Sequence, residues 1–173
     1  LFVNFFSDSF PALAFAFENG AGGASTRLAG SRGLFDRRMR VLIVVVGVCT
    51  SVLLLVLYWA LLWMGIAAEL VRTFIFATFS IYSLMLAFSL RSLDKSIFSY
   101  NPFANRALTA GVGIGIGLTL LALYIPPLRD AFGMALLPPI WLIGVFGVGL
   151  FNISLAEIGK WVVRKTIDNA HRA

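Results

Sequence analysis

The sequence predicts an all-α membrane protein, a polytopic helical bundle of about five transmembrane helices. Of its 173 residues, 60% are hydrophobic and 13% are charged, whereas soluble domains average about 45 to 50% and about 25%. The apolar residues also fall in uncharged runs near the roughly 20 residues that cross a bilayer. Finally, the basic residues gather on alternate connections between these runs. Together these observations exclude a water-soluble globule.

The opening segment, residues 1–18, predicts the later part of a first span, because it is apolar apart from a few polar residues. The chain begins with Leu1 rather than Met and shows no signal-peptide pattern. We therefore expect it to be a piece of a longer protein whose N-terminal part is missing. Residues 19–40, which contain a stretch rich in Gly, Ala and Ser, predict a cytoplasmic loop.

Four uncharged runs predict the other spans, so that residues 41–165 form a four-helix bundle. Charged residues bound most of these runs, and Pro126 and Pro127 end the third, as expected at helix ends. Residues 166–173 predict a cytoplasmic tail. The runs are 41–64, 73–90, 107–125 and 139–155.

Orientation follows from the basic residues, because basic flanks are retained on the cytoplasmic side. Twelve of the 14 Lys and Arg lie between the first and second spans, between the third and fourth, or after the fifth. Only Arg72 and Arg129 lie on the other side. The pattern predicts a multi-pass protein with a cytoplasmic C-terminus and the lipid bilayer as its partner. No nucleic-acid partner is expected, since these residues are scattered beside membrane spans.

The first segment is the part of the sequence that suggests chemistry. Asp8 is an ionisable residue inside an apolar span, where charge is costly and usually functional. Asn4 and Ser7 lie four and one residues before it, so a helix brings the three side chains toward one face. Pro11 also leaves the carbonyl of Ser7 without its helical donor. Such oxygens suit a hard, partly dehydrated cation. The alternative is that Asn4 and Ser7 form interhelical hydrogen bonds while Asp8 pairs with a missing helix.

The same segment resembles a known family. The run Asn4-Phe5-Phe6-Ser7-Asp8-Ser9-Phe10-Pro11-Ala12 is similar to the sixth transmembrane segment of calcium-type cation-transporting P-type ATPases. Further similarities follow in the family's order and spacing, and they extend the resemblance to segments six to ten. They are Ser89-Leu90-Arg91-Ser92, Tyr124-Ile125-Pro126-Pro127-Leu128 and Glu157-Ile158-Gly159-Lys160-Trp161.

The resemblance implies that Asn4, Ser7 and Asp8 are ligands of a transported cation. Calcium is favoured, because sodium and potassium pumps of this type usually carry a second Asp where Asn4 stands. Leu93 occupies roughly the position of a Glu that completes a second calcium site, which implies at most one transported ion per cycle. The implied location is the plasma membrane.

The expected function is thus the C-terminal membrane domain of an ATP-driven cation pump. ATP and magnesium would act only through domains missing from this chain, which offers no catalytic or cofactor-binding residues of its own. The alternative is a freestanding helical membrane protein that serves as a structural or regulatory subunit.

Two other features are interpreted as structural. The glycines of residues 111–117 form the small-x-x-x-small pairs Gly111 with Gly115 and Gly113 with Gly117, which predict close helix packing. Glu157 lies near the end of the fifth span, and we expect it to pair with a basic residue rather than to bind an ion.

Overall fold

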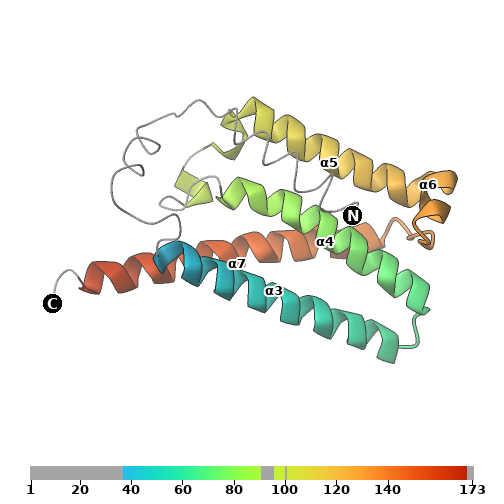
Figure 1. Ribbon diagram of the computed structural model, residues 1–173, viewed down its shortest axis with the longest axis horizontal. Coiled ribbons are helices and arrows are strands. Elements are labelled where there is room, and N and C mark those ends of the chain that lie inside the picture. Colours follow the sequence, from blue (N-terminus) through green and yellow to red (C-terminus); the bar gives the residue numbers. More distant parts are fainter. Residues whose placement is uncertain (1–36, 91–95, 100, 171–173) are drawn as a thin grey trace.

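The computed structural model describes residues 37–90, 96–99 and 101–170, without the side chains of residues 37–43, 98, 163, 164 and 166–170. These residues form long helices joined by short connections, and no strand occurs among them. Figure 1 shows the long helices running along one common direction. The predicted all-α membrane bundle is therefore confirmed.

Among the described residues, four helices are long and apolar enough to cross a membrane, and each overlaps one of the four predicted runs. They are α3 (Arg37–Trp63), α4 (Ala68–Leu90), α5 (Arg106–Tyr124) and α7 (Trp141–Ala170). The segment expected to hold a fifth, residues 1–18, lies outside the described residues. Helix α7 continues to Ala170, past residue 155 where the uncharged run ends, because charged residues such as Glu157 and Lys160 favour helix and do not end it.

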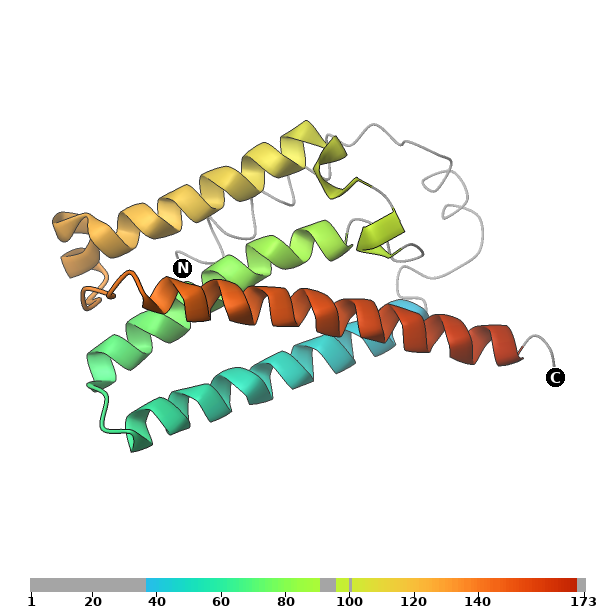
Figure 2. The ribbon, with the colours of Figure 1, turned by 180° about the vertical axis from the view of Figure 1, so that it is seen from behind.

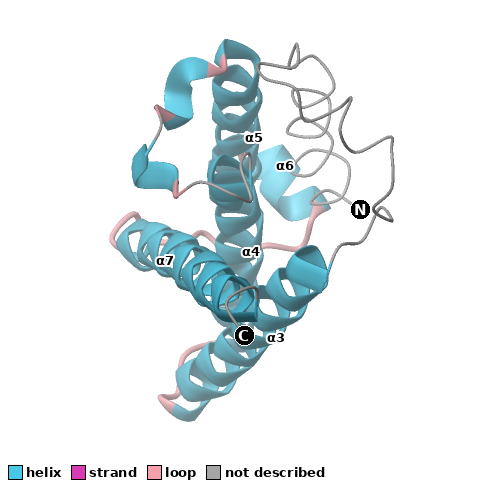
Figure 3. Ribbon diagram, turned by 90° about the vertical axis from the view of Figure 1, so that its left-hand side faces the viewer, coloured by secondary structure: helices cyan, strands magenta, loops and turns pink. Residues whose placement is uncertain are grey.

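Helix α4 is the centre of the bundle, because it packs against α3, α5 and α7. Half of its span is buried, whereas 11% of the span of α3 is buried. Figure 3, a view along the bundle, shows α3, α5 and α7 arranged around α4. Helix α3 also packs against α7, but most of its span is left uncovered by the other described helices.

Two tight turns reverse the chain at one end of the bundle, and each relies on a glycine. Gly65, with φ of 78°, follows α3, and Gly133, with φ of 60°, follows the short helix α6 (Pro126–Ala131). The amides of Gly65 and Ile66 donate to carbonyls three and five residues earlier, the bonding pattern of a Schellman motif. Gly133 and Met134 repeat this pattern. A positive φ favours glycine because it has no Cβ.

At the other end, two 3₁₀ helices follow α4. They are η2 (Ile97–Ser99) and η3 (Pro102–Ala104). Asn105 then caps α5 by accepting a hydrogen bond from the amide of Leu108 at 3.0 Å. The connection between α4 and α5 is therefore ordered by local hydrogen bonds where the structure describes it.

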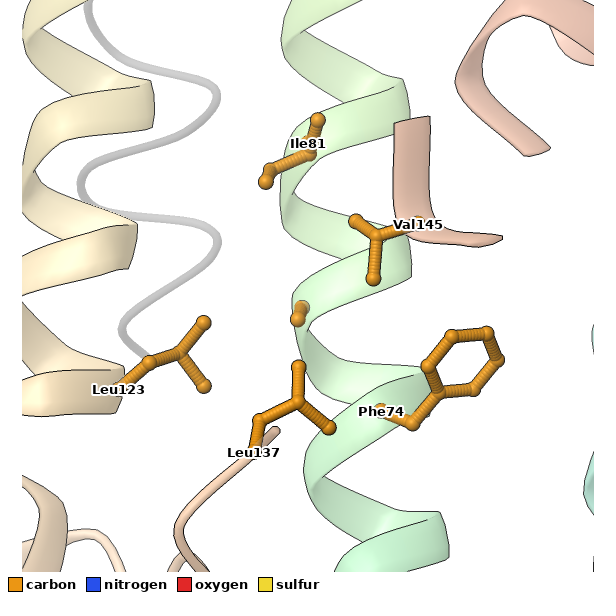
Figure 4. Packing of buried hydrophobic residues seen from close by; sticks show 6 residues of the cluster. Phe74, Ile81, Leu123, Leu137 and Val145 are labelled. Atoms are coloured by element: carbon orange, nitrogen blue, oxygen red, sulfur yellow. The ribbon is translucent and has the colours of Figure 1, made fainter. Parts of the chain in front are cut away.

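The main core lies between α4, α5 and α7. Phe74 packs edge-on against Trp141, with ring centroids 5.3 Å apart. Figure 4 shows side chains from α4, α5, α7 and the connection before α7 meeting here. The connection contributes Leu137, so burial also holds it against the bundle. The fully or nearly buried members are Phe74, Ala77, Ile81, Leu123, Leu137 and Val145.

Close packing is confirmed for one glycine of the two predicted pairs, Gly115. Gly111 and Gly115 are buried on α5, and a Cβ added at Gly115 would lie 2.6 Å from Cδ2 of Leu84. Gly113 and Gly117 have no atom within 4 Å of an added Cβ. Gly115 faces α4 while Gly113 and Gly117 do not, because residues two apart on a helix point about 200° away from each other.

Candidate functional site

The predicted cation ligands Asn4, Ser7 and Asp8 lie outside the described residues, and so does Leu93. Among the residues that the structure describes, no group of three or more His, Cys, Asp or Glu could hold a metal ion. The polar contacts that the structure does bring together join one helix to another. The largest joins the end of α4 to α7.

We call this set of residues the polar cluster: Ser89, Ile97, Glu157 and Lys160. Its charged members come from α7, where a spacing of three residues places Glu157 and Lys160 on the same side of the helix. The Lys160 Nζ lies 2.8 Å from Oε1 of Glu157. The side chain of Lys160 is 0% exposed and that of Glu157 is 10% exposed. The cluster is therefore an ion pair largely removed from solvent.

Groups of α4 and η2 form further hydrogen bonds with both charged side chains. The Ser89 hydroxyl donates to Oε1 of Glu157 at 2.6 Å, and the Ile97 amide donates to Oε2 at 3.1 Å. The Lys160 ammonium also donates to the backbone carbonyl of Ser89. A buried charge is tolerated only when it is paired and hydrogen-bonded. Both charges of this cluster meet that condition.

The cluster acts chemically as a helix cap. Ser89 is next to the last residue of α4, and the final carbonyls of a helix have no partner within it. An ammonium group at that end satisfies one such carbonyl and interacts favourably with the helix dipole. Glu157 also accepts a hydrogen bond from the amide of Ile97, the first residue of η2. The cluster thus fixes the end of α4 and part of the following connection to α7, and both oxygens of its carboxylate accept hydrogen bonds.

The expectation that Glu157 pairs with a basic residue is confirmed, since its partner is Lys160. The burial of Lys160 was not predicted, since in the sequence this residue is one of the basic residues that follow the last uncharged run. The three-residue spacing from Glu157 was the available signal. The contact with Ser89 had no local signal, because the two residues are 71 positions apart.

Two further contacts join elements through polar side chains. The Thr50 hydroxyl on α3 donates to the side-chain oxygen of Asn152 on α7, and both residues are buried. Asn152 in turn donates to the carbonyl of Val148 at 3.0 Å. On α4, the Thr73 hydroxyl donates to the carbonyl of Glu69 and accepts the amide of Ala135, at 2.8 and 2.9 Å. Thr73 therefore holds the connection after α6 against α4.

Two buried hydroxyls in the middle of α4 have no hydrogen-bond partner among the residues that the structure describes. They belong to Thr78 and Ser80, and each residue is 0% exposed. An unsatisfied buried hydroxyl lowers stability relative to an apolar group of the same shape. These two positions therefore do not contribute to holding the bundle together through polar contacts.

Comparison with known proteins identifies the family. The family described as "Cation transporting ATPase, C-terminus" matches residues 1–162. A "Calcium-transporting ATPase" of Bacillus subtilis (strain 168) is 30% identical over 174 residues, covering 95% of this chain and 19% of the relative. A "Calcium-transporting ATPase 1" of Bacillus cereus (strain ATCC 10987 / NRS 248) is 38% identical over 63 residues, covering 36% and 7%. The chain therefore spans about a fifth, or less, of these curated relatives.

Proposed function

Because this chain belongs to the family of cation-transporting P-type ATPase C-terminal domains, we propose that it contributes cation ligands to an ATP-driven pump. The observation that carries the proposal is the family match, which includes the segment with Asn4, Ser7 and Asp8. In this proposal the carboxylate, amide and hydroxyl oxygens of these residues replace part of the hydration shell of the ion. ATP and magnesium act at domains that lie outside this sequence.

Among the side chains that the structure describes, Glu157 is the most buried carboxylate. The carboxylate of Glu157 accepts hydrogen bonds from Lys160, Ser89 and the amide of Ile97. It has no oxygen without a donor to offer to an ion. We therefore assign the ligands of this chain to the first segment rather than to the polar cluster.

Calcium is the cation that we propose. Two relatives bear the name calcium-transporting ATPase, and Asn4 stands where a carboxylate would favour a different ion. The side chain of Leu93 offers no oxygen, so we propose one transported calcium ion per cycle. We also propose that the domain lies in the plasma membrane with its C-terminus in the cytoplasm, as the distribution of basic residues predicts.

The test of the ligand assignment is Asp8→Asn in the full-length pump that carries this sequence. We expect calcium-dependent phosphorylation by ATP to be lost while the protein still inserts in the membrane. Asp130→Asn is the matched control, since Asp130 is an exposed carboxylate on α6. Undiminished calcium-dependent phosphorylation in the Asp8 variant would overturn the assignment.

Stoichiometry and orientation have separate tests. Equilibrium binding of radioactive calcium should give one ion per phosphorylatable site, and two ions would contradict the interpretation of Leu93. Single cysteines at Ser25 and Ala170, in a background with Cys49 replaced, should be protected from an impermeant reagent in intact cells. Labelling of either cysteine would contradict the proposed orientation.

A further inference from the structure

Helix α7 exposes one continuous apolar face, which we call the outer face of α7. At about 100° per residue, its large exposed side chains fall within about a third of the helix circumference, so they lie along one side of the helix. The same helix turns Asn152, Glu157 and Lys160 toward α3 and α4, where they are bonded. The members of the outer face are Ile143, Leu150, Phe151, Ile158, Trp161 and Val162.

The polar group on the outer face is already hydrogen-bonded within α7, so the face needs no polar partner. Ser154 is exposed on it, and its hydroxyl already donates to the carbonyl of Leu150 at 3.0 Å. Gly147 and Ser154 are the small residues exposed on this face, but the residues four positions from each of them are bulky. They are Ile143, Leu150, Phe151 and Ile158. Helix surfaces that pack on other membrane helices are rich in small-x-x-x-small pairs and in polar groups. The outer face has the composition that suits lipid chains.

The length of the outer face matches a bilayer. From Ile143 to Val162 a helix rises about 30 Å, which is about the thickness of the hydrocarbon layer. Helix α7 then continues to Ala170. Figure 2 shows this end of α7, in red, extending past the ends of the neighbouring helices. The turn that follows Val162 is therefore at the level of the lipid headgroups.

A cation and an indole ring meet at that level. The Nζ of Lys165 lies 5.1 Å from the centroid of the Trp161 ring, and both residues are exposed. Trp residues are enriched where the hydrocarbon layer meets the headgroups. A Lys ammonium there can reach phosphate while its aliphatic stem stays on apolar surface. The ring therefore holds the ammonium where lipid phosphates lie.

We propose that the outer face of α7 is a lipid-contact surface of the assembled pump, and that Lys165, held over Trp161, binds the phosphate of an anionic phospholipid. Two observations favour lipid over a protein partner. The Lys165 ammonium is opposite in charge to a lipid phosphate, and the length of the apolar face matches the thickness of the hydrocarbon layer. This inference goes beyond the proposed function and does not depend on which cation is transported.

The experiment uses the full-length pump in nanodiscs that contain photoactivatable phosphatidylglycerol or photoactivatable phosphatidylcholine, each with its reactive group near the headgroup. Mass spectrometry then measures cross-linking to the peptide that contains residues 158–165. We expect about fivefold more cross-linking with phosphatidylglycerol, the ratio that corresponds to about 1 kcal/mol per basic residue near an anionic surface. Lys165→Gln should bring this ratio close to one.

Arg106→Gln is the matched control, because Arg106 is exposed at the start of α5, at the same end of the bundle. This variant should leave the ratio at α7 unchanged. Cross-linking of other helices but not of α7 would show that protein covers the outer face and would overturn the proposal. A ratio that does not fall in Lys165→Gln would overturn the phosphate site. Calcium-dependent phosphorylation in the same nanodiscs reports separately on the proposed function.

Discussion

The ammonium group of Lys160 donates a hydrogen bond to the backbone carbonyl of Ser89, which joins two helices across 71 positions of sequence. Lys160 is 1% exposed, so this contact lies in the interior and not at a hydrated helix end. It places a positive charge at the C-terminal end of α4, where the helix dipole is negative.

Replacing Lys160 by Met should destabilise the protein by about 3 kcal/mol, because it leaves Glu157 poorly solvated without its cation. Thermal unfolding of the detergent-purified protein measures this effect. Lys165→Met is the control and should change little, since Lys165 is exposed. The double variant with Glu157→Gln should be more stable than Lys160→Met alone. A double variant that is less stable than the single one would contradict the ion-pair explanation.

The contact between Thr50 and Asn152 should contribute about 0.6 kcal/mol, the average for hydrogen bonds between membrane helices. A double-mutant cycle with Thr50→Val and Asn152→Leu measures the coupling through the unfolding free energies of all four forms. We expect the two effects to be less than additive, because either substitution alone breaks the same hydrogen bond. Strict additivity would show that the contact contributes nothing.

Gly115→Ala should destabilise the protein by about 1 kcal/mol, because the new methyl group would force Leu84 out of its packed position. Leu84 is 0% exposed, so it has little room to move. Gly113→Ala is the control on the same helix. It meets no atom within 4 Å and should be neutral or slightly stabilising, since Ala favours helix. Equal thermal stability of the two variants would refute close packing at Gly115.

The same substitution should have opposite effects at two threonines of α4. Thr73→Val leaves the amide of Ala135 without its acceptor and should cost about 1 to 3 kcal/mol. Thr78→Val removes a buried hydroxyl that has no partner, so it should preserve or raise stability. Thermal unfolding of both variants provides the comparison. A larger loss at Thr78 than at Thr73 would contradict these hydrogen-bond assignments.

The four described spans could be predicted because the bilayer itself sets their length and their apolar character. Residues 107–125, for example, needed no knowledge of neighbouring helices to be assigned, and α5 occupies Arg106–Tyr124. The cation ligands Asn4, Ser7 and Asp8 remain a prediction from the sequence, outside the described residues. Their pattern is local, since all three fall within two helical turns.

Only the tertiary structure decided which residues meet across the bundle. The glycine pattern of residues 111–117 is nearly symmetrical, and the position of α4 determined that Gly115 is packed while Gly113 is not. The basic residues after the last span look alike in sequence, yet Lys160 is buried and Lys165 is exposed. The physical reason is the same in both cases. Composition and spacing determine that a segment enters the membrane and which residues share a face, whereas the partner of that face comes from a helix many residues away.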